Sequence, residues 1–208
     1  MILNPAMLDD NLRHKFLIGS IVPRPIAWVS SMSTAGVLNL APFSFFTIAA
    51  SHPMTLLFCP QIPSGSGIPK DTLLNIKELP EFVINLTNED TVIPMNLSAT
   101  DLPRNVSEFE WAKVTAAPSE TIRVPRVAEA PISFECKLQR IVTISDAPGG
   151  GSVVFGEVQM IHIRDDLYQE NGRISLELLK PIARLAGSSY ARVTDTFNLD
   201  RVPPPPTK

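Results

Sequence analysis

Apolar residues gather in short runs along the chain, and polar or turn-forming residues separate them. We expect strands over residues 26–33, 37–47, 54–59, 81–86, 132–145 and 152–163. Two segments favour helices: 72–79, after a cap at Asp71, and 90–99, after Asn88. Because strands outnumber helices and no β-α-β alternation is present, the pattern predicts a mainly β fold with short helices, either a barrel or a sandwich.

Two connections are typical of hairpins. Residues 34–36 join the first two strands, and Gly36 is available for a positive φ. The glycine-containing segment 146–151 joins the two long late strands. A strand rather than a helix follows this second turn, which excludes a dinucleotide-binding fingerprint.

Composition and charge narrow the class of protein. The 208 residues have the length and apolar content of one domain, with a core at about 15–192 and a proline-rich tail at 202–208. A net charge of −3 without a Lys/Arg cluster argues against a nucleic-acid partner. Charges interrupt residues 1–16, and the longest apolar stretch, 41–50, is too short for a bilayer. We therefore expect no membrane association and a cytoplasmic location.

The common catalytic constellations are missing from the sequence. The histidines His14, His52 and His162 are far apart, so no metal site is expected. Cys59 and Cys136 form no C-x-x-C pair, and no G-x-S-x-G elbow occurs. A well-marked core without such groups indicates either a binding module or an enzyme whose chemistry belongs to a cofactor.

Residues 24–33 and 39–46 form the first polar feature. Pro42 cannot donate to a central strand ladder, so the sheet should open near residues 41–44. The freed backbone groups, beside the small side chains of Ser30, Ser31, Ala41 and Ser44, could accept a flat heteroaromatic ring. The alternative is that Pro42 marks an edge or a bulge and the aromatic residues belong to the core.

A second feature is the hydroxyl-rich loop 64–69, which leads into a helix start. The unpaired N–H groups of a helix N-terminus suit a phosphate, with charge from Lys70 and a donor from Thr72. Asp71 is better explained as the helix cap. The alternative is a capped helix behind a solvated loop. Near the C-terminus, residues 181–190 either cover the mouth of a pocket or form an ordinary closing turn.

Taken in order, these segments resemble one family. Residues 23–31 with 39–46 resemble the first motif of the flavin reductase-like, flavoredoxin-type proteins. Residues 70–76 with 81–86 resemble the second motif, and 184–190 the third, with departures at Ala186 and Ser189. The match runs from about residue 15 to 192, which favours the flavin-site interpretation of both polar features.

The resemblance implies an FMN-binding split β-barrel of Greek-key type and a homodimer with the flavin near the subunit interface. It implies that one group of residues lines the ring or ribityl chain, namely Ser30, Ser31, Met32, Asn39, Ala41, Pro42, Phe43, Ser44 and Phe45. Lys70, Asp71 and Thr72 would hold the phosphate, with Arg184 and Tyr190 completing the site. Residues 109–115 would reach the partner's flavin.

The resemblance leaves three functions open. In the first, NAD(P)H reduces bound FMN by hydride transfer, which needs no protein acid or base. The reduced flavin then passes to a partner monooxygenase or to another acceptor. In the second, the protein is an electron carrier that keeps FMN bound. In the third, it binds another phosphorylated ring and has no redox role.

Overall fold

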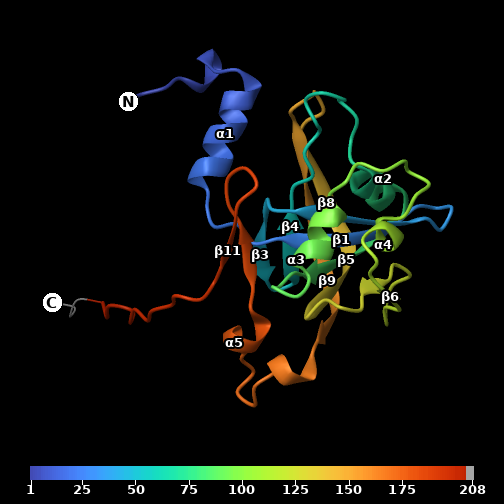
Figure 1. Cartoon of the computed structure of the whole chain (residues 1–208), viewed down its shortest axis with the longest axis vertical. Helices are drawn as coiled ribbons and strands as arrows, with labels where there is room; N and C mark the ends of the chain where they lie inside the picture. Colours follow the sequence, from blue (N-terminus) through green and yellow to red (C-terminus); the bar gives the residue numbers. More distant parts are fainter. Residues whose placement is uncertain (205–208) are drawn as a thin grey trace.

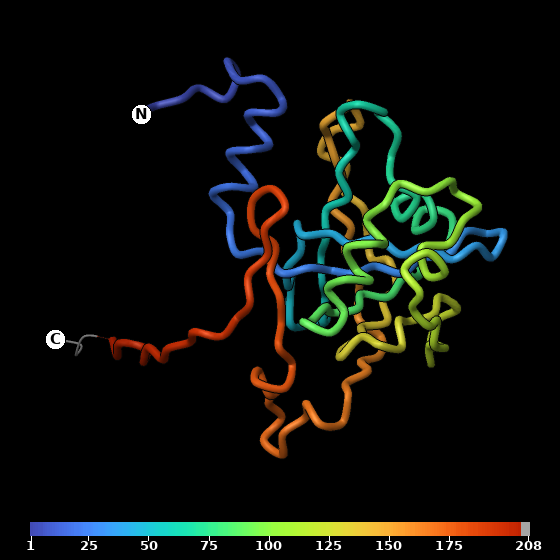
Figure 2. Tube along the Cα trace, in the orientation of Figure 1, coloured from blue at the N-terminus to red at the C-terminus, as the bar shows by residue number. Residues whose placement is uncertain are grey.

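A seven-stranded antiparallel sheet forms the body of the molecule, of which the computed structural model describes residues 1–204 (Figures 1 and 2). The strand order is β2-β1-β5-β8-β9-β4-β3. The strands are β1 (Ala27–Met32), β2 (Leu38–Phe43), β3 (Phe46–Ser51), β4 (Met54–Phe58), β5 (Glu81–Leu86), β8 (Ile132–Ser145) and β9 (Gly151–Ile163). The mainly β fold expected from the sequence is confirmed.

The two edge strands of this sheet, β2 and β3, are consecutive in the chain. Only Ser44 and Phe45 separate them. Such a short link cannot cross a flat seven-stranded sheet, in which neighbouring strands are about 4.8 Å apart. The sheet therefore curls until its edges meet at one end, which produces a split barrel.

Short helices and smaller strand pairs surround the sheet. The helix α2 (Asp71–Glu78) packs against β1 and β2, and α4 (Glu108–Trp111) also contacts β2. The helix α1 (Asp10–Ser20) stands beside the body and buries none of its residues. The remaining elements are η1 (Pro5–Met7), α3 (Val92–Leu97), β6 (Ala116–Ala117), β7 (Arg126–Val127), η2 (Asp165–Leu167), α5 (Leu176–Leu179), β10 (Ile182–Arg184) and β11 (Tyr190–Arg192).

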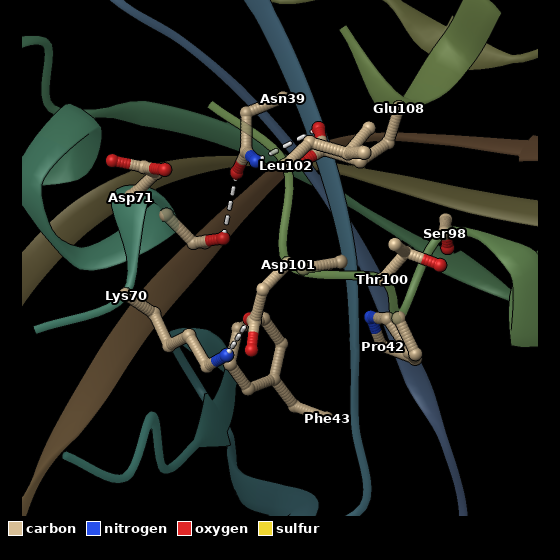
Figure 3. A pocket seen from close by; sticks show the side chains of 13 residues that line it. Asn39, Pro42, Phe43, Lys70, Asp71, Ser98, Thr100, Asp101, Leu102 and Glu108 are labelled. Carbon is tan, nitrogen blue, oxygen red and sulfur yellow. Dashed lines mark hydrogen bonds and ion pairs between the residues drawn. The ribbon is translucent and has the colours of Figure 1, made fainter. Parts of the chain in front are cut away.

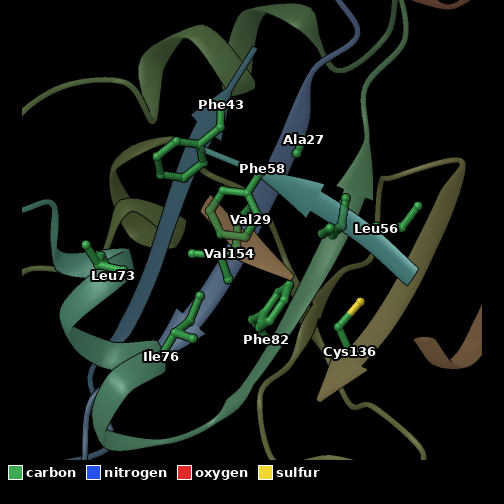
Figure 4. Packing of buried hydrophobic residues seen from close by; sticks show 11 residues of the cluster. Ala27, Val29, Phe43, Leu56, Phe58, Leu73, Ile76, Phe82, Cys136 and Val154 are labelled. Carbon is green, nitrogen blue, oxygen red and sulfur yellow. The ribbon is translucent and has the colours of Figure 1, made fainter. Parts of the chain in front are cut away.

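Three phenylalanines form the centre of the core (Figure 4). The ring centroids of Phe43 and Phe58 are 5.0 Å apart, and those of Phe58 and Phe82 are 5.6 Å apart. Gly156 of β9 makes this packing possible, because an added Cβ would lie 2.3 Å from Cζ of Phe82. The core thus joins the edge strand β2 to β5 and to β4, next to the opposite edge.

The strand β1 is covered on both faces. Ala27 and Val29 point into the phenylalanine core, whereas Trp28 belongs to a second buried cluster with Leu40 and Met95. The indole N–H of Trp28 donates to Oγ of Ser98 at 2.8 Å. This second cluster fixes the segment after α3 against the sheet.

Several expected elements have different bounds in the structure. The expected strand over 37–47 was wrong, because β2 ends at Phe43 and the chain crosses to β3. The cap expected at Asp71 was also wrong, since Lys70 is the N-cap and Asp71 already belongs to the helix. The expected helix over 90–99 is shorter, because the side chain of Asn88 accepts from the N–H of Thr91 and holds a turn before α3.

The two expected hairpin turns are present, whereas the N-terminal helix α1 was not expected. Gly36 has φ +83° in the first hairpin, and Gly149 has φ +80° in the second. The sequence reasoning missed α1, although Asp9 caps it by accepting from the N–H of Leu12 at 2.8 Å. The expected extended tail falls partly outside the described residues, and 202–204 carry no regular structure.

Glu135 is a fully buried carboxylate that joins β8 to a neighbouring loop. It accepts from the backbone N–H groups of Glu120 at 2.7 Å and Thr121 at 2.8 Å. His162 of β9 lies 2.6 Å away. Burial raises the pKa of Glu135, but the hydrogen bonds from Thr121, Glu120 and His162 outweigh it and lower the pKa to about 2.

Because the folded pKa of Glu135 is lower than the unfolded pKa, its contribution to stability is complete above pH ~4.5 and disappears as the pH falls toward ~2. We expect Glu135→Gln to lower the free energy of unfolding by about 2–3 kcal/mol at neutral pH. Urea unfolding at about pH 7, 4 and 2.5 should show this difference shrinking with pH. A difference that stays constant over this range would contradict the assignment.

Candidate functional site

A hollow surface forms where the chain leaves β2 for β3. Pro42 lies on the edge strand β2 and pairs with Trp28 of β1. Its missing N–H therefore costs no hydrogen bond in the centre of the sheet. Three adjoining hollows meet at Pro42. The break in the barrel therefore positions the candidate site.

The first hollow, which we call the polar pocket, has a cavity volume of about 110 Å³ (Figure 3). Its walls come from β2, the start of α2, the segment after α3 and the start of α4. The lining residues are Asn39, Ala41, Pro42, Phe43, Lys70, Asp71, Thr72, Ser98, Ala99, Thr100, Asp101, Leu102 and Glu108.

The N-terminus of α2 supplies donors to this pocket. The backbone N–H groups of Asp71 and Thr72 make no hydrogen bond within the described part of the chain. Nζ of Lys70 lies 2.5 Å from Oδ1 of Asp101, across the pocket. The carboxylate of Asp71 faces Nε of Arg104 at 3.8 Å. Positive charge from Lys70 and the helix end thus gathers at one wall.

A buried hydrogen-bond network forms the floor. Oδ1 of Asn39 accepts from Oγ1 of Thr72 at 2.7 Å and from Oγ of Ser31 at 3.0 Å. Nδ2 of Asn39 and the backbone N–H of Leu40 both donate to Oε2 of Glu108 at 2.9 Å. Burial raises the pKa of Glu108, and these hydrogen bonds act against that increase. The network fixes the rotamers of Asn39 and Thr72 beside the pocket.

The other two hollows adjoin the polar pocket at Pro42, and we call them together the Arg184 groove. Arg184 donates to the hydroxyl of Tyr190, and its guanidinium carbon lies 4.5 Å from the centre of the Tyr190 ring. The lining residues are His14, Ile18, Ile26, Pro42, Phe43, Ser44, Phe45, Cys59, Gln61, Lys70, Met95, Asn96, Ala99, Arg184, Tyr190, Leu185 and Gly187. Lys70 and Pro42 border both the groove and the polar pocket.

The structure brings together most of the residues expected from the sequence. The residues that border the pocket or the groove are Asn39, Ala41, Pro42, Phe43, Ser44, Phe45, Lys70, Asp71, Thr72, Arg184 and Tyr190.

Ser30, Ser31 and Met32 border none of these hollows. Oγ of Ser30 donates to the carbonyl of Pro125 at 2.7 Å, and Met32 packs against a separate buried cluster. Ser31 reaches the site only through Asn39. Their contact with a ligand stays a prediction.

Sequence reasoning missed several residues of the site. The wall formed by Ser98 and residues 99–102 carries no motif, and Glu108 resembles any carboxylate that begins a capped helix. Arg24 opens the first polar feature but was given no role, and its Nε donates to Oγ of Ser44 at 3.3 Å. Burial lowers the pKa of Arg24, and the nearby charge of Arg184 lowers it further.

Two further features of the described residues bear on the class of protein. Within residues 1–204, no group of three or more His, Cys, Asp or Glu side chains is placed to hold a metal ion. Among the described helices, none is long and apolar enough to cross a membrane.

Comparison with known proteins identifies close structural relatives. Nitrilotriacetate monooxygenase component B from Bacillus cereus is 41% identical, with a TM-score of 0.91, over 96% of this chain and 98% of that chain. A 2-nitrobenzoate 2-nitroreductase from Pseudomonas fluorescens is 35% identical, with a TM-score of 0.87, over 98% of this chain and 96% of that chain.

A more distant structure addresses the fold alone. A flavin reductase candidate with a split barrel domain from Shewanella frigidimarina is 18% identical, with a TM-score of 0.82, over 97% of this chain and 100% of that chain. The split β-barrel predicted from the sequence is confirmed.

The family model described as "Flavin reductase like domain" matches residues 18–191. This match confirms the family resemblance and supports flavin binding and a flavin-related oxidoreductase function. The chain belongs to the flavin reductase like domain family.

Proposed function

We propose that this protein is an FMN-binding reductase, in which NAD(P)H transfers a hydride to bound FMN. The observation that carries the proposal is that a donor-rich wall, formed by Lys70 and the start of α2, meets at Pro42 a second hollow that contains Arg184 and the apolar surface of Pro42 and Phe43. Flavin mononucleotide has the matching halves, an anionic phosphate and a flat ring. Family membership supports the flavin.

The polar pocket suits the phosphate half. Lys70 offers an ammonium group, and the free N–H groups of Asp71 and Thr72 point out of the start of α2. This donor set fits a phosphate monoester, with Lys70 and Thr72 as the holding residues.

The region of Pro42 suits the ring. Ala41 and Ser44 are small. Pro42 and Phe43 present apolar surface to both the polar pocket and the Arg184 groove. In the Arg184 groove, Arg184 is held by its hydrogen bond to Tyr190 and could face the polar edge of a ring. We assign ring contacts to these residues.

The chain itself provides binding and orientation. FMN, when bound, supplies a ring that accepts a hydride from a nicotinamide. Glu108 is held by hydrogen bonds and Asp71 faces Arg104, and hydride transfer needs no general base from the protein. Rate enhancement would come from positioning.

The relatives support a proposal for the acceptor of the reduced flavin. Component B of a monooxygenase is 41% identical to this chain, so we propose a monooxygenase as acceptor of the reduced flavin. The nitroreductase relative makes an organic nitro compound a second candidate acceptor. The alternative function, an electron carrier that keeps its FMN, uses the same site without a nicotinamide.

The test of the proposed activity is the anaerobic visible spectrum of the FMN-loaded protein. We expect rapid bleaching of the flavin band after NADH or NADPH is added. A firmly bound flavin that neither nucleotide bleaches would overturn the reductase proposal and favour the carrier.

Lys70→Ala tests the phosphate assignment. Loss of a charge-assisted hydrogen bond, worth about 1.5–3 kcal/mol, should weaken FMN binding roughly 10- to 150-fold. Riboflavin lacks the phosphate, so its affinity should not change. Fluorescence titration measures both ligands, and Lys77→Ala, exposed in the last turn of the same helix, is the matched control. An equal loss for both ligands would refute the assignment.

We also propose a homodimer, because exposed apolar side chains gather near both termini. Phe16 and Leu17 of α1 are 48% and 56% exposed, and Phe197 and Leu199 are more than 80% exposed. The helix α1 and the C-terminal segment lie on the same side of the body (Figure 1). Sedimentation equilibrium should give twice the mass of one chain, 22.8 kDa. A stable monomer would contradict this proposal.

A further inference from the structure

Lys70 and Asp101 form an ion pair across the polar pocket (Figure 3). Nζ of Lys70 lies 2.5 Å from Oδ1 of Asp101. The two side chains differ in exposure, since 37% of Lys70 and 86% of Asp101 are accessible to solvent. Asp101 belongs to the irregular segment after α3 and therefore reaches the pocket from outside.

The other carboxylates that line the pocket have partners of their own. Asp71 faces Arg104, which also contacts Glu78 at 3.4 Å. Glu108 accepts from the amide of Asn39 and from a backbone N–H. Among the described residues, Asp101 is thus the acidic group that pairs with Lys70.

We propose that Asp101 sets the affinity of this site for a phosphate group by competing with the phosphate for Lys70. The inference rests on the proposed function, in which Lys70 holds the phosphate of FMN. A phosphate monoester carries about −1.5 to −2 charges at neutral pH, more than one carboxylate, so it takes the ammonium from Asp101. Asp101 is exposed, so its carboxylate can move into water at little cost.

Competition of this kind lowers affinity without blocking the site. The phosphate must displace Asp101 from Lys70 before it can pair with the ammonium group. When FMN dissociates, Asp101 can pair with Lys70 again. The residue therefore favours a flavin that exchanges, as a reductase serving a separate monooxygenase requires, over a flavin that stays bound.

The competition also determines specificity. Riboflavin has no phosphate and does not contend with Asp101 for Lys70. Asp101 thus narrows the preference for FMN over riboflavin, whereas Lys70 widens it. Asp101 and Lys70 thus change the ratio of the FMN and riboflavin affinities in opposite directions.

The experiment compares Asp101→Asn with the unaltered chain by fluorescence titration of FMN and riboflavin, and by stopped-flow measurement of FMN release. We expect FMN to bind about two- to fivefold more tightly to Asp101→Asn, which corresponds to an exposed ion pair. FMN release should slow by a similar factor, and riboflavin binding should not change. Glu170→Gln removes an exposed carboxylate outside the pocket and is the matched control.

A Lys70→Ala chain provides the second half of the test. In that background, Asp101→Asn should give a much smaller gain, because the group under competition is gone. A gain of the same size there, an equal gain for riboflavin, or weaker FMN binding by Asp101→Asn would overturn the inference. These outcomes leave the proposed function standing, whereas failure of the unaltered chain to bind either flavin would refute both.

Discussion

The link of two residues between β2 and β3 is the constraint on which the rest of the structure depends. From Phe43 to Phe46 the chain makes three steps, which reach at most about 11 Å. The first and last strands of a seven-stranded sheet must therefore meet, and the sheet has no option but to curl. The phenylalanine core fills the interior that the curling creates, and the pocket and the groove both lie at the end of β2, where the link begins.

Local patterns were enough to predict β1, β4, β5, β8 and β9, because burial on one face of a strand depends on the residues of that strand. The hairpin turn at Gly36 was predictable because a positive φ favours glycine at that position. The break after Phe43 was not, since it follows from the closing of the sheet and not from the residues beside it. Pro42 correctly indicated that its strand is not central in the sheet. It did not indicate that the chain then crosses to the opposite edge of the sheet.

Some residues of the candidate site could likewise be predicted from the local sequence, and others could not. Lys70 and Thr72 could be found because a loop that leads into a helix start is a local motif. Asp101 and Glu108 could not, because long-range packing brings them to β2 from segments without a recognisable pattern. Met32 shows the opposite difficulty. It lies next to polar residues in the sequence, but strand geometry directs its side chain toward a separate cluster.

The buried guanidinium of Arg24 has a consequence for any molecule that contacts the N-terminal helix. It donates to the carbonyls of Ile18 and Ile21 at the end of α1, and to the carbonyl of Leu185 beside the groove. The position of α1 and the shape of the groove wall are thus joined through one side chain. If docking on α1 changed the affinity of the groove for a ligand, thermodynamic linkage would require occupancy of the groove to change the affinity of α1 for its partner by the same factor.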